Sequence, residues 1–349
     1  MHERFRTLRT VAVSALAFAA WLSMARCGGG GTTAPSVPPP PTGPIGQTGP
    51  TGSTGTPITE LFVGAGDIGY AGLDGAKLTG QILNTIGGQV FTAGDNAYMN
   101  ATAAEFQRNY DPYWGPHKAR TRPVPGNHEY DPPGDPNNYF DYFGALAGPR
   151  GLGYYSYEVG DWHVIALNSA LRTQGGFANG SAQIDWLKAD LAQHQNTGCT
   201  VAIWHHPLFS SGQNGNAGFT RDAWTWLYQA GVEIVINGHD HSYERFAPQT
   251  PDGIFDPNGI REFVVGTGGA VPYGFSSIQP NSERRLSGEV HSSPGNNMFG
   301  VLKLTLTTGS YSWEFVTTSG VQDSGPSVQC HAPNVRAATA NPFTMLQRR

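Results

Sequence analysis

The sequence predicts an α/β domain, because short, mostly apolar runs alternate with stretches of helical periodicity. Five runs have the length of buried strands, namely Leu61–Ala65, Gln89–Ala93, Arg122–Pro125, Thr200–Trp204 and Val232–Ile236. Helices are expected over Ser181–His194 and Phe219–Ala230. In the first helix, Ile184, Leu187 and Leu191 recur at helical spacing, so we expect this face to pack against a sheet.

Each of the five expected strands is followed by side chains of the types that bind metal ions. The blocks are "GDIG" with Asp67, "GDNAY" with Asp95 and Tyr98, "GNHE" with Asn127, His128 and Glu129, "HHP" with His205 and His206, and "GHDH" with His239 and His241. One Gly-Asp pair is ordinary turn chemistry, but five such blocks in series are hard to explain by turns. Residues just past the strands of an open α/β sheet lie at its carboxyl edge, where such sheets bind ligands.

The composition of this set indicates which ions it would bind. Oxygen and nitrogen ligands without thiolates suit iron, manganese or zinc, and the set is too large for one tetrahedral ion. Two ions are therefore implied. Two-metal hydrolases hold their ions about 3.5–4 Å apart, which normally requires a bridging carboxylate. Asp95, in the middle of the set, is the natural bridge.

The five blocks in this order resemble the calcineurin-like metallophosphoesterases, and specifically the purple acid phosphatases, over residues 59–330. "GDNAY" favours the purple acid phosphatases, because serine/threonine protein phosphatases continue from the Gly-Asp pair with an Asp-Arg-Gly element that is absent here. The resemblance implies two facing mixed β-sheets flanked by helices, with a dinuclear metal site at the carboxyl ends of the strands.

The resemblance also implies a role for each residue of the set. The first ion, Fe³⁺, would be bound by Asp67, Tyr98 and His241. Asp95 would bridge, and the second ion, Fe²⁺, Zn²⁺ or Mn²⁺, would be bound by Asn127, His205 and His239. His128 matches the family histidine that contacts the substrate phosphate and assists the leaving group. The family ligand precedes a variable residue and a proline, so alignment on Pro207 selects His205 over His206.

The activity implied is that of an acid phosphatase: hydrolysis of phosphate monoesters of small phosphorylated substrates, with a metal-bound water or hydroxide as nucleophile. A phosphodiesterase or nucleotidase on the same fold is the first alternative. A non-catalytic surface protein with a structural metal site is the second. His128 favours an enzyme, because a structural metal site has no use for an unligated histidine beside its ligands.

Several other polar residues are expected to have supporting or structural roles. His163 is predicted to be a structural histidine, and His117, His194 and His291 are predicted to lie on the surface. Glu129 either orients His128 or stabilises its turn. Three residues follow the histidine pair and are expected to support the metal-binding side chains or to pack at the rim of the site, namely Tyr243, Glu244 and Arg245.

Residues 1–27 are expected to be an export signal. Basic residues precede the apolar run Val11–Leu22, which is too short for a stable membrane span. Cys27 follows in the position of a lipidated lipoprotein cysteine, but Arg26 stands where a small residue is expected. Membrane anchoring through a lipidated Cys27 and plain secretion both stay open, and either places the protein outside the cytoplasm, as a secreted, periplasmic or surface protein.

The rest of the chain divides into a linker, one domain and a tail. Residues 28–58 are expected to be a disordered linker, since 9 Gly and 8 Pro make up 17 of the 30 residues Gly28–Pro57. Residues 59–330 are enough for one sizeable core. Residues 331–349 lack periodicity and are expected to be a flexible tail.

Charge and cysteine content limit the partners and the compartment. The formal net charge is −5 and no basic stripe is present, so nucleic acid is not an expected partner. The sequence does not indicate an oligomeric state. If Cys27 is lipidated or removed, Cys199 and Cys330 remain as a candidate disulfide in an oxidising compartment. Such a bond is expected to hold the carboxyl-terminal strand beside the strand that carries His205.

Overall fold

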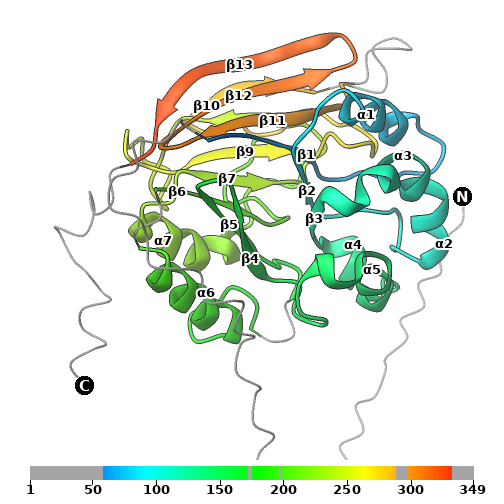
Figure 1. The fold of residues 1–349 in the computed structure, drawn as a ribbon, viewed down its shortest axis with the longest axis horizontal. Helices are drawn as coiled ribbons and strands as arrows, with labels where there is room; N and C mark the ends of the chain where they lie inside the picture. Colours follow the sequence, from blue (N-terminus) through cyan, green and yellow to red (C-terminus); the bar gives the residue numbers. More distant parts are fainter. Residues whose placement is uncertain (1–57, 172–174, 196–197, 288–297, 332–349) are drawn as a thin grey trace, which may run out of the picture. The chain divides into compact units, whose positions relative to one another are not determined.

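Two mixed β-sheets enclose the main core of the protein (Figure 1). The first sheet has the strand order β13-β12-β11-β1-β2-β3, and the second has the order β10-β8-β9-β7-β6-β5-β4. The strands of the first sheet are β1 (Thr59–Ala65), β2 (Gln89–Ala93), β3 (Thr121–Val124), β11 (Gly300–Thr307), β12 (Ser310–Thr317) and β13 (Gly320–Gln329). Those of the second are β4 (Tyr155–Val159), β5 (Trp162–Ala166), β6 (Cys199–Ile203), β7 (Ile234–Asn237), β8 (Tyr243–Phe246), β9 (Arg261–Val265) and β10 (Ser282–Leu286).

This computed structural model describes residues 58–171, 175–195, 198–287 and 298–331. The expected export signal with Cys27, almost all of the expected linker, His291 and the expected tail from residue 332 lie outside the described residues. Within the described ranges, no helix has both the length and the apolar composition that a membrane span requires.

Each of the five strands that carry the metal-binding blocks runs parallel to at least one neighbour in its sheet. In the first sheet β1, β2 and β3 are parallel, and in the second sheet β5, β6, β7 and β9 are parallel. Parallel neighbours have their carboxyl ends at the same edge of a sheet. The loops after these strands therefore come together. Antiparallel strands widen each sheet at its sides.

Burial along the strands follows the layering. β5, β7 and β9 are buried at every residue, as expected of parallel strands covered on both faces. β12 instead alternates between buried and partly exposed residues, because only one of its faces meets the core. Aromatic rings on that face contact the second sheet: Phe315 stacks on Tyr243 at 4.1 Å, and Trp313 lies 5.9 Å from Phe263. These pairs hold the two sheets together.

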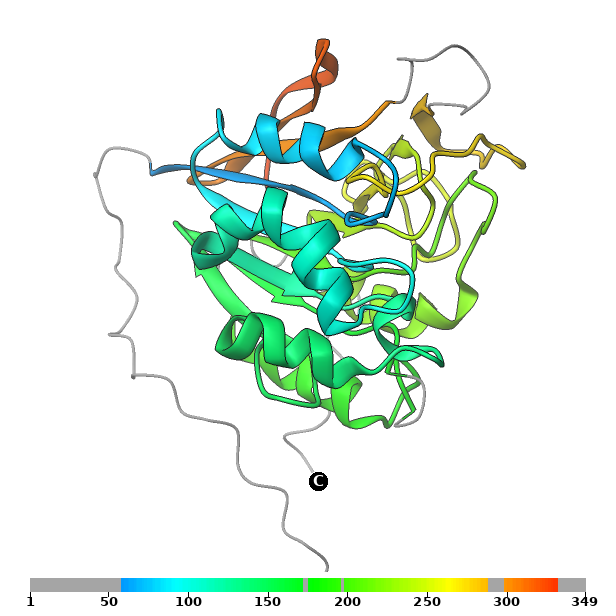
Figure 2. The same cartoon turned by 90° about the vertical axis from the view of Figure 1, so that its right-hand side faces the viewer.

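Helices cover the outer sides of both sheets (Figures 1 and 2). Two of them pack on the second sheet and bury a core of their own: α6 (Ala182–Gln193) contributes Ile184, Leu187 and Leu191, and α7 (Arg221–Ala230) contributes Trp224 and Leu227. Both helices lie where the sequence predicted them. The helices in the first half of the chain are α1 (Gly75–Leu83), α2 (Ala103–Glu105), α3 (Asp111–Trp114), α4 (Asn127–Tyr130) and α5 (Pro136–Phe143).

One histidine predicted to lie on the surface is buried. His117 is only 8% exposed, in the turn before β3, and its Nδ1 lies 3.2 Å from Arg120 Nη2. Burial and the neighbouring charge of Arg120 lower the pKa of His117. The prediction was wrong because it rested on the polar segment around His117. Helices that fold back over the sheet bury this side chain. His194 is also half-buried, since it stacks on His163.

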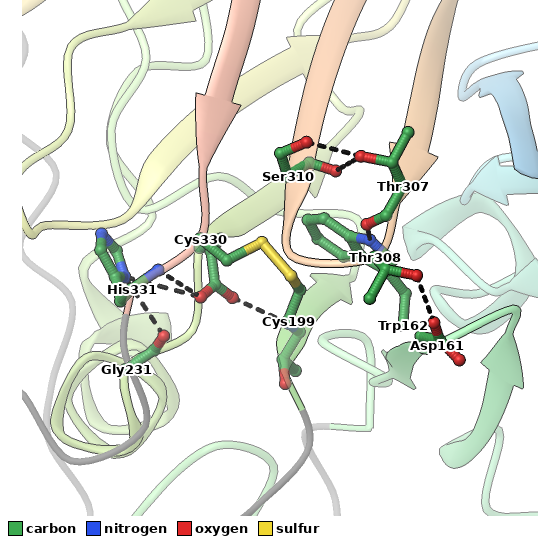
Figure 3. Close-up of a disulfide and its surroundings, with 11 residues drawn as sticks. Asp161, Trp162, Cys199, Gly231, Thr307, Thr308, Ser310, Cys330 and His331 are labelled. Atoms are coloured by element: carbon green, nitrogen blue, oxygen red, sulfur yellow. Dashed lines mark hydrogen bonds and ion pairs between the residues drawn. A yellow bond between two sulfur atoms is a disulfide. The ribbon is translucent and has the colours of Figure 1, made fainter. Parts of the chain in front are cut away.

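A disulfide joins Cys199, the first residue of β6, to Cys330, which follows β13 (Figure 3). The two strands belong to different sheets, so the bond links the sheets. The sequence had suggested instead that the bond holds two strands side by side. The buried carboxylate of Glu233 accepts the N–H of Thr200 at 2.7 Å and that of His331 at 3.1 Å, beside the two half-cystines.

We expect the disulfide to contribute to stability through its loop length. The cysteines are 131 residues apart, and in the chain-entropy account, whose mechanism is disputed, closing such a loop stabilises by up to about 5 kcal/mol. Replacing both cysteines by alanine is expected to lower the urea midpoint, and dithiothreitol is expected to lower it only in the wild type. Thiol titration of the unfolded, unreduced protein is expected to find neither cysteine reactive; two reactive thiols contradict the bond.

Candidate metal centre

The residues predicted to bind metals lie together at the carboxyl edge of the parallel strands. Asp67 follows β1, Asp95 and Tyr98 follow β2, Asn127 and His128 begin α4 after β3, His205 follows β6, and His239 and His241 follow β7. The ligand atoms of Asp67, Asp95 and His205 all lie within 4.8 Å of one another, and all three residues are buried. Loops from both sheets therefore contribute to one cluster.

The backbone at this cluster is strained. Among the described residues, four non-glycine residues have positive φ, and three of them are Asp67 (60°), Asp95 (50°) and His239 (71°). A positive φ raises the conformational free energy of any residue that has a Cβ, and such conformations concentrate at functional sites. Glycines provide the necessary space: a Cβ at Gly238 would lie 2.5 Å from Asp67 Oδ2, and one at Gly126 would lie 2.1 Å from Asp95 Oδ1.

One group of ligands gathers around the hydroxyl of Tyr98. This oxygen lies 2.7 Å from Asp67 Oδ1 and 3.0 Å from His241 Nε2. His241 Nε2 in turn lies 3.3 Å from Asp67 Oδ1. A carboxylate, a phenol and an imidazole thus converge on one point, and these are the three residues that the family pattern places at the first ion.

A second group gathers around His205. Its Nε2 lies 3.1 Å from Asn127 Oδ1, and its ring centroid lies 5.1 Å from that of His239. Asp95 stands between the two groups, because its Oδ2 lies 3.1 Å from the Tyr98 hydroxyl and 3.1 Å from His205 Nε2. One carboxylate oxygen therefore faces both groups, which is the position that a bridging carboxylate would take.

Backbone carbonyls orient the imidazoles. His205 Nδ1 lies 2.8 Å from Ala93 O, and His241 Nδ1 lies 2.7 Å from Val271 O. Each Nδ1 therefore donates its proton to a carbonyl, so Nε2 presents its lone pair to the centre when the ring is neutral. Histidines that bind metals almost always have such a partner on the other ring nitrogen. The residues present thus fit a metal centre in chemistry and in orientation.

The electrostatics of the cluster also favour cations. Burial would raise the pKa of Asp67, but the nearby His205 and His241 outweigh it and lower that pKa. Burial raises the pKa of Tyr98 well above its usual value, and the carboxylates of Asp67 and Asp95 raise it further. A tyrosinate can therefore form here only if a cation offsets the two carboxylates. Burial and His205 lower the pKa of His239 to about 4, which keeps its ring neutral and able to bind a metal.

His128 lies beside these ligands in a different setting. Its backbone N–H donates to Asp95 Oδ1 at 2.9 Å, and its ring lies 4.5 Å from that of Tyr98. Nδ1 is 2.5 Å from Met99 O, and Nε2 is 3.8 Å from Asp95 Oδ2. The side chain is 27% exposed, whereas His205 is fully buried. His128 therefore stands at the edge of the cluster, where a substrate can reach it.

His205 and His206 have different surroundings. His205 is the residue beside Asp95 and Asn127. His206 is buried one step farther out, with its Nδ1 2.8 Å from Ser169 Oγ and its ring 4.4 Å from that of His239. The geometry thus agrees with the alignment on Pro207.

Glu129 has a larger role than its sequence position indicated. Its buried carboxylate accepts the backbone N–H groups of Asp95 (3.1 Å), Asn96 (2.7 Å) and Gly126 (2.7 Å). Burial and the charge of Asp95 raise its pKa to about 7. Its oxygens are directed to these backbone groups, so the turn-stabilising interpretation fits. The sequence signal was the glutamate three residues after Gly126, a capping position.

Tyr273 is a neighbour of the centre that the sequence analysis missed. Its ring stacks on His241 at 4.5 Å, and its hydroxyl donates to His239 O at 2.8 Å. It lies in an irregular segment after β9 with no motif, so no sequence signal could have identified it. The residues after the histidine pair support the fold from β8: Tyr243 and Arg245 hydrogen-bond Asp323, and Glu244 accepts the N–H of Ser211.

Comparison with known proteins identifies the family. A model of the calcineurin-like phosphoesterase family matches residues 61–243. The chain belongs to this family. Among known relatives, it is 30% identical to purple acid phosphatase 15 of Arabidopsis thaliana over 181 residues, which cover 47% of this chain and 33% of that protein. It is 29% identical to purple acid phosphatase 23 of the same plant over 205 residues, covering 54% and 43%.

Solved structures share the fold. A purple acid phosphatase from yellow lupin (Lupinus luteus) seeds matches with a TM-score of 0.63 at 22% identity, covering 78% of this chain and 54% of that one. GAP50, the anchor in the inner membrane complex of Plasmodium, matches with a TM-score of 0.58 at 14% identity, covering 78% and 89%. The predicted fold of two mixed sheets with flanking helices is confirmed. The chain matches 33% and 43% of the lengths of the two Arabidopsis relatives, so these matches do not define its activity or its substrates.

Proposed function

We propose that this protein hydrolyses phosphate monoesters at a dinuclear metal centre. The observation that carries the proposal is the position of Asp95, whose Oδ2 lies 3.1 Å from both Tyr98 and His205. A single-ion structural site needs no carboxylate shared between two ligand groups. A two-metal hydrolase needs such a shared carboxylate, because its ions lie only about 3.5–4 Å apart. Membership of the calcineurin-like phosphoesterase family supports the same activity.

The two ligand groups suit different ions. Asp67, Tyr98 and His241 would hold the first ion, for which we propose Fe³⁺, because phenolate and carboxylate oxygens are hard ligands. The second group is better suited to Fe²⁺, Zn²⁺ or Mn²⁺ and comprises Asn127, His205 and His239. When bound, such ions would polarise the phosphate and lower the pKa of bound water, which makes that water a better nucleophile.

His128 is proposed to act on the leaving group. Its backbone N–H is tied to Asp95 and its Nδ1 to Met99 O, so Nε2 is held near the place where a phosphate ester would bind. With Nδ1–H donating to the carbonyl, Nε2 carries a proton only in the imidazolium form. A proton on Nε2 can be passed to the departing alkoxide.

Two other functions rest on the same residues. A phosphodiesterase or nucleotidase would use the same centre and differ in the loops that hold the rest of the substrate. A non-catalytic surface protein would keep the ligands but has no need of a partly exposed His128 beside them.

Export is part of the proposal. The disulfide between Cys199 and Cys330 supports an oxidising compartment, because such bonds are rare in the cytosol. We propose that the domain acts outside the cytoplasm, secreted, periplasmic or anchored through Cys27, on small phosphorylated substrates.

A substrate panel on metal-analysed protein tests the function. Aryl and alkyl monoesters are expected to have higher kcat/KM than a diester, whereas nucleoside monophosphates and phytate, which are also monoesters, show what the enzyme prefers in the rest of the substrate. Asp95→Ala, run in parallel, is expected to lose both ions after dialysis, since both ligand groups share this carboxylate. Preferred cleavage of the diester would establish the first alternative, and one ion retained at full affinity in Asp95→Ala would show that Asp95 is not the bridge.

Replacing His128 by alanine is expected to leave both metal ions bound and to lower turnover by about 10²–10⁴-fold, as for loss of a general acid. Alkyl phosphates, which have poor leaving groups, are expected to lose most. The remote His194→Gln is the control and is expected to keep wild-type turnover. Equal losses on an aryl and an alkyl phosphate would assign His128 to substrate positioning.

Tyr98→Phe tests the proposed tyrosinate. A phenolate bound to Fe³⁺ absorbs visible light by charge transfer, so the iron-loaded wild type is expected to be violet to pink. The variant is expected to lose the band and keep part of its activity. Tyr70→Phe is a matched control, because its ring lies 5.5 Å from that of Tyr98 and outside the ligand set. A band that survives in Tyr98→Phe, or a colourless wild type, would remove Tyr98 from the ligands.

A further inference from the structure

A second cluster of metal-binding side chains lies far from the candidate metal centre. It comprises Glu158 of β4, His163 of β5 and His194 at the end of α6, whose ligand atoms lie within 4.8 Å of one another. His163 is the second residue of its strand, whereas the candidate metal centre is built from residues that follow the carboxyl ends of the strands. The two clusters are therefore at opposite ends of the second sheet.

Asp190 orients both imidazoles of this cluster. Its Oδ2 lies 2.8 Å from His163 Nε2, and its Oδ1 accepts the hydroxyl of Ser156 at 2.6 Å. Its backbone carbonyl lies 2.8 Å from His194 Nδ1. One nitrogen of each ring is thus directed to Asp190, and the other nitrogen is directed to the carboxylate of Glu158. Metal-binding histidines are held in this way by a carboxylate or a carbonyl on the opposite nitrogen.

The distances on the Glu158 side lie on either side of those in a zinc site. The two imidazole rings are stacked, with centroids 3.8 Å apart and 18° between their planes, so His194 must turn out of the stack for both rings to point at one ion. Glu158 Oε1 lies 2.7 Å from His163 Nδ1 and 3.9 Å from His194 Nε2. Ligand atoms around a tetrahedral zinc ion, with bonds of about 2.0–2.1 Å, lie roughly 3.3–3.4 Å apart, between these two values. His163 is 1% exposed and fixed, while Glu158 (50%) and His194 (31%) are exposed enough to adjust their side chains.

We propose that Glu158, His163 and His194 bind one divalent ion of the zinc type, with Asp190 holding the two imidazoles in position. Two imidazoles and one carboxylate are a known zinc-binding set that leaves a fourth position for water. The exposure of Glu158 and His194 gives an ion access from solvent. Such an ion links the edge strand β4 to the end of α6, so its expected effect is on stability and not on hydrolysis.

The same contacts also allow a simpler arrangement. A protonated His163 between Glu158 and Asp190 forms an ion-pair network that needs no metal. The two arrangements differ in what happens when zinc is added, because only the metal site gains stability from it.

The test uses the full chain with its other metal ions loaded, dialysed against low micromolar zinc and then analysed for metal. The wild type is expected to hold one more zinc ion per chain than Glu158→Gln and His194→Gln. Asp185→Asn, on the exposed side of the same helix, is the matched control and is expected to keep that ion. Zinc is expected to raise the melting temperature of the wild type and of the control by several degrees, and to leave both cluster variants unchanged.

Both cluster variants alter side chains that are only partly buried, so they are expected to fold, which circular dichroism checks. Equal zinc content in the wild type and the variants would overturn the proposal, because the ion would then bind elsewhere or not at all. An unchanged melting temperature of the wild type with zinc would also overturn it. The measurement compares the zinc content of the wild type with that of the variants, and the expected difference is one ion per chain. This difference does not depend on which ions the candidate metal centre binds.

Discussion

The arrangement of the candidate metal centre depends on the carboxylate of Asp95. Its Oδ2 faces Tyr98 and His205, and its Oδ1 accepts the N–H of His128, so one side chain joins the two ligand groups to the residue proposed for leaving-group chemistry. Its backbone N–H is held by Glu129, whose carboxylate also binds the loop after β3. Two buried acids, Asp95 two residues after β2 and Glu129 five residues after β3, thus set the geometry, and the charge of Asp95 raises the pKa of Glu129.

This concentration of charge requires a rigid surrounding. The parallel strands bring five loops to one edge, and aromatic pairs such as Phe315 with Tyr243 fill the space between the sheets behind them. At the far side, the disulfide of Cys199 and Cys330 joins the sheets where β6 begins. The strand that positions His205 is therefore fixed at both ends, by a covalent bond at its start and by polar contacts at its end.

The two histidine clusters of the second sheet follow the same physical rule with different results. In each, a carbonyl or carboxylate orients an imidazole so that its other nitrogen faces an acid. In the candidate metal centre the acids are buried and two ligand groups share one of them, which suits a pair of ions and hydrolysis. In the outer cluster the acid that faces both imidazoles, Glu158, is half-exposed, which suits one ion and a structural role.

The sequence by itself determined the fold class, the five strands and the chemistry at their ends, because strand and helix periodicity and Gly-bounded blocks are local signals. It also indicated the candidate disulfide by counting cysteines. Only the tertiary structure placed that bond between the sheets, buried His117, gave Glu129 its three backbone partners and brought Tyr273 onto His241. It alone assembled Glu158, His163 and His194, because contacts between distant segments arise from packing, to which no local pattern in the chain corresponds.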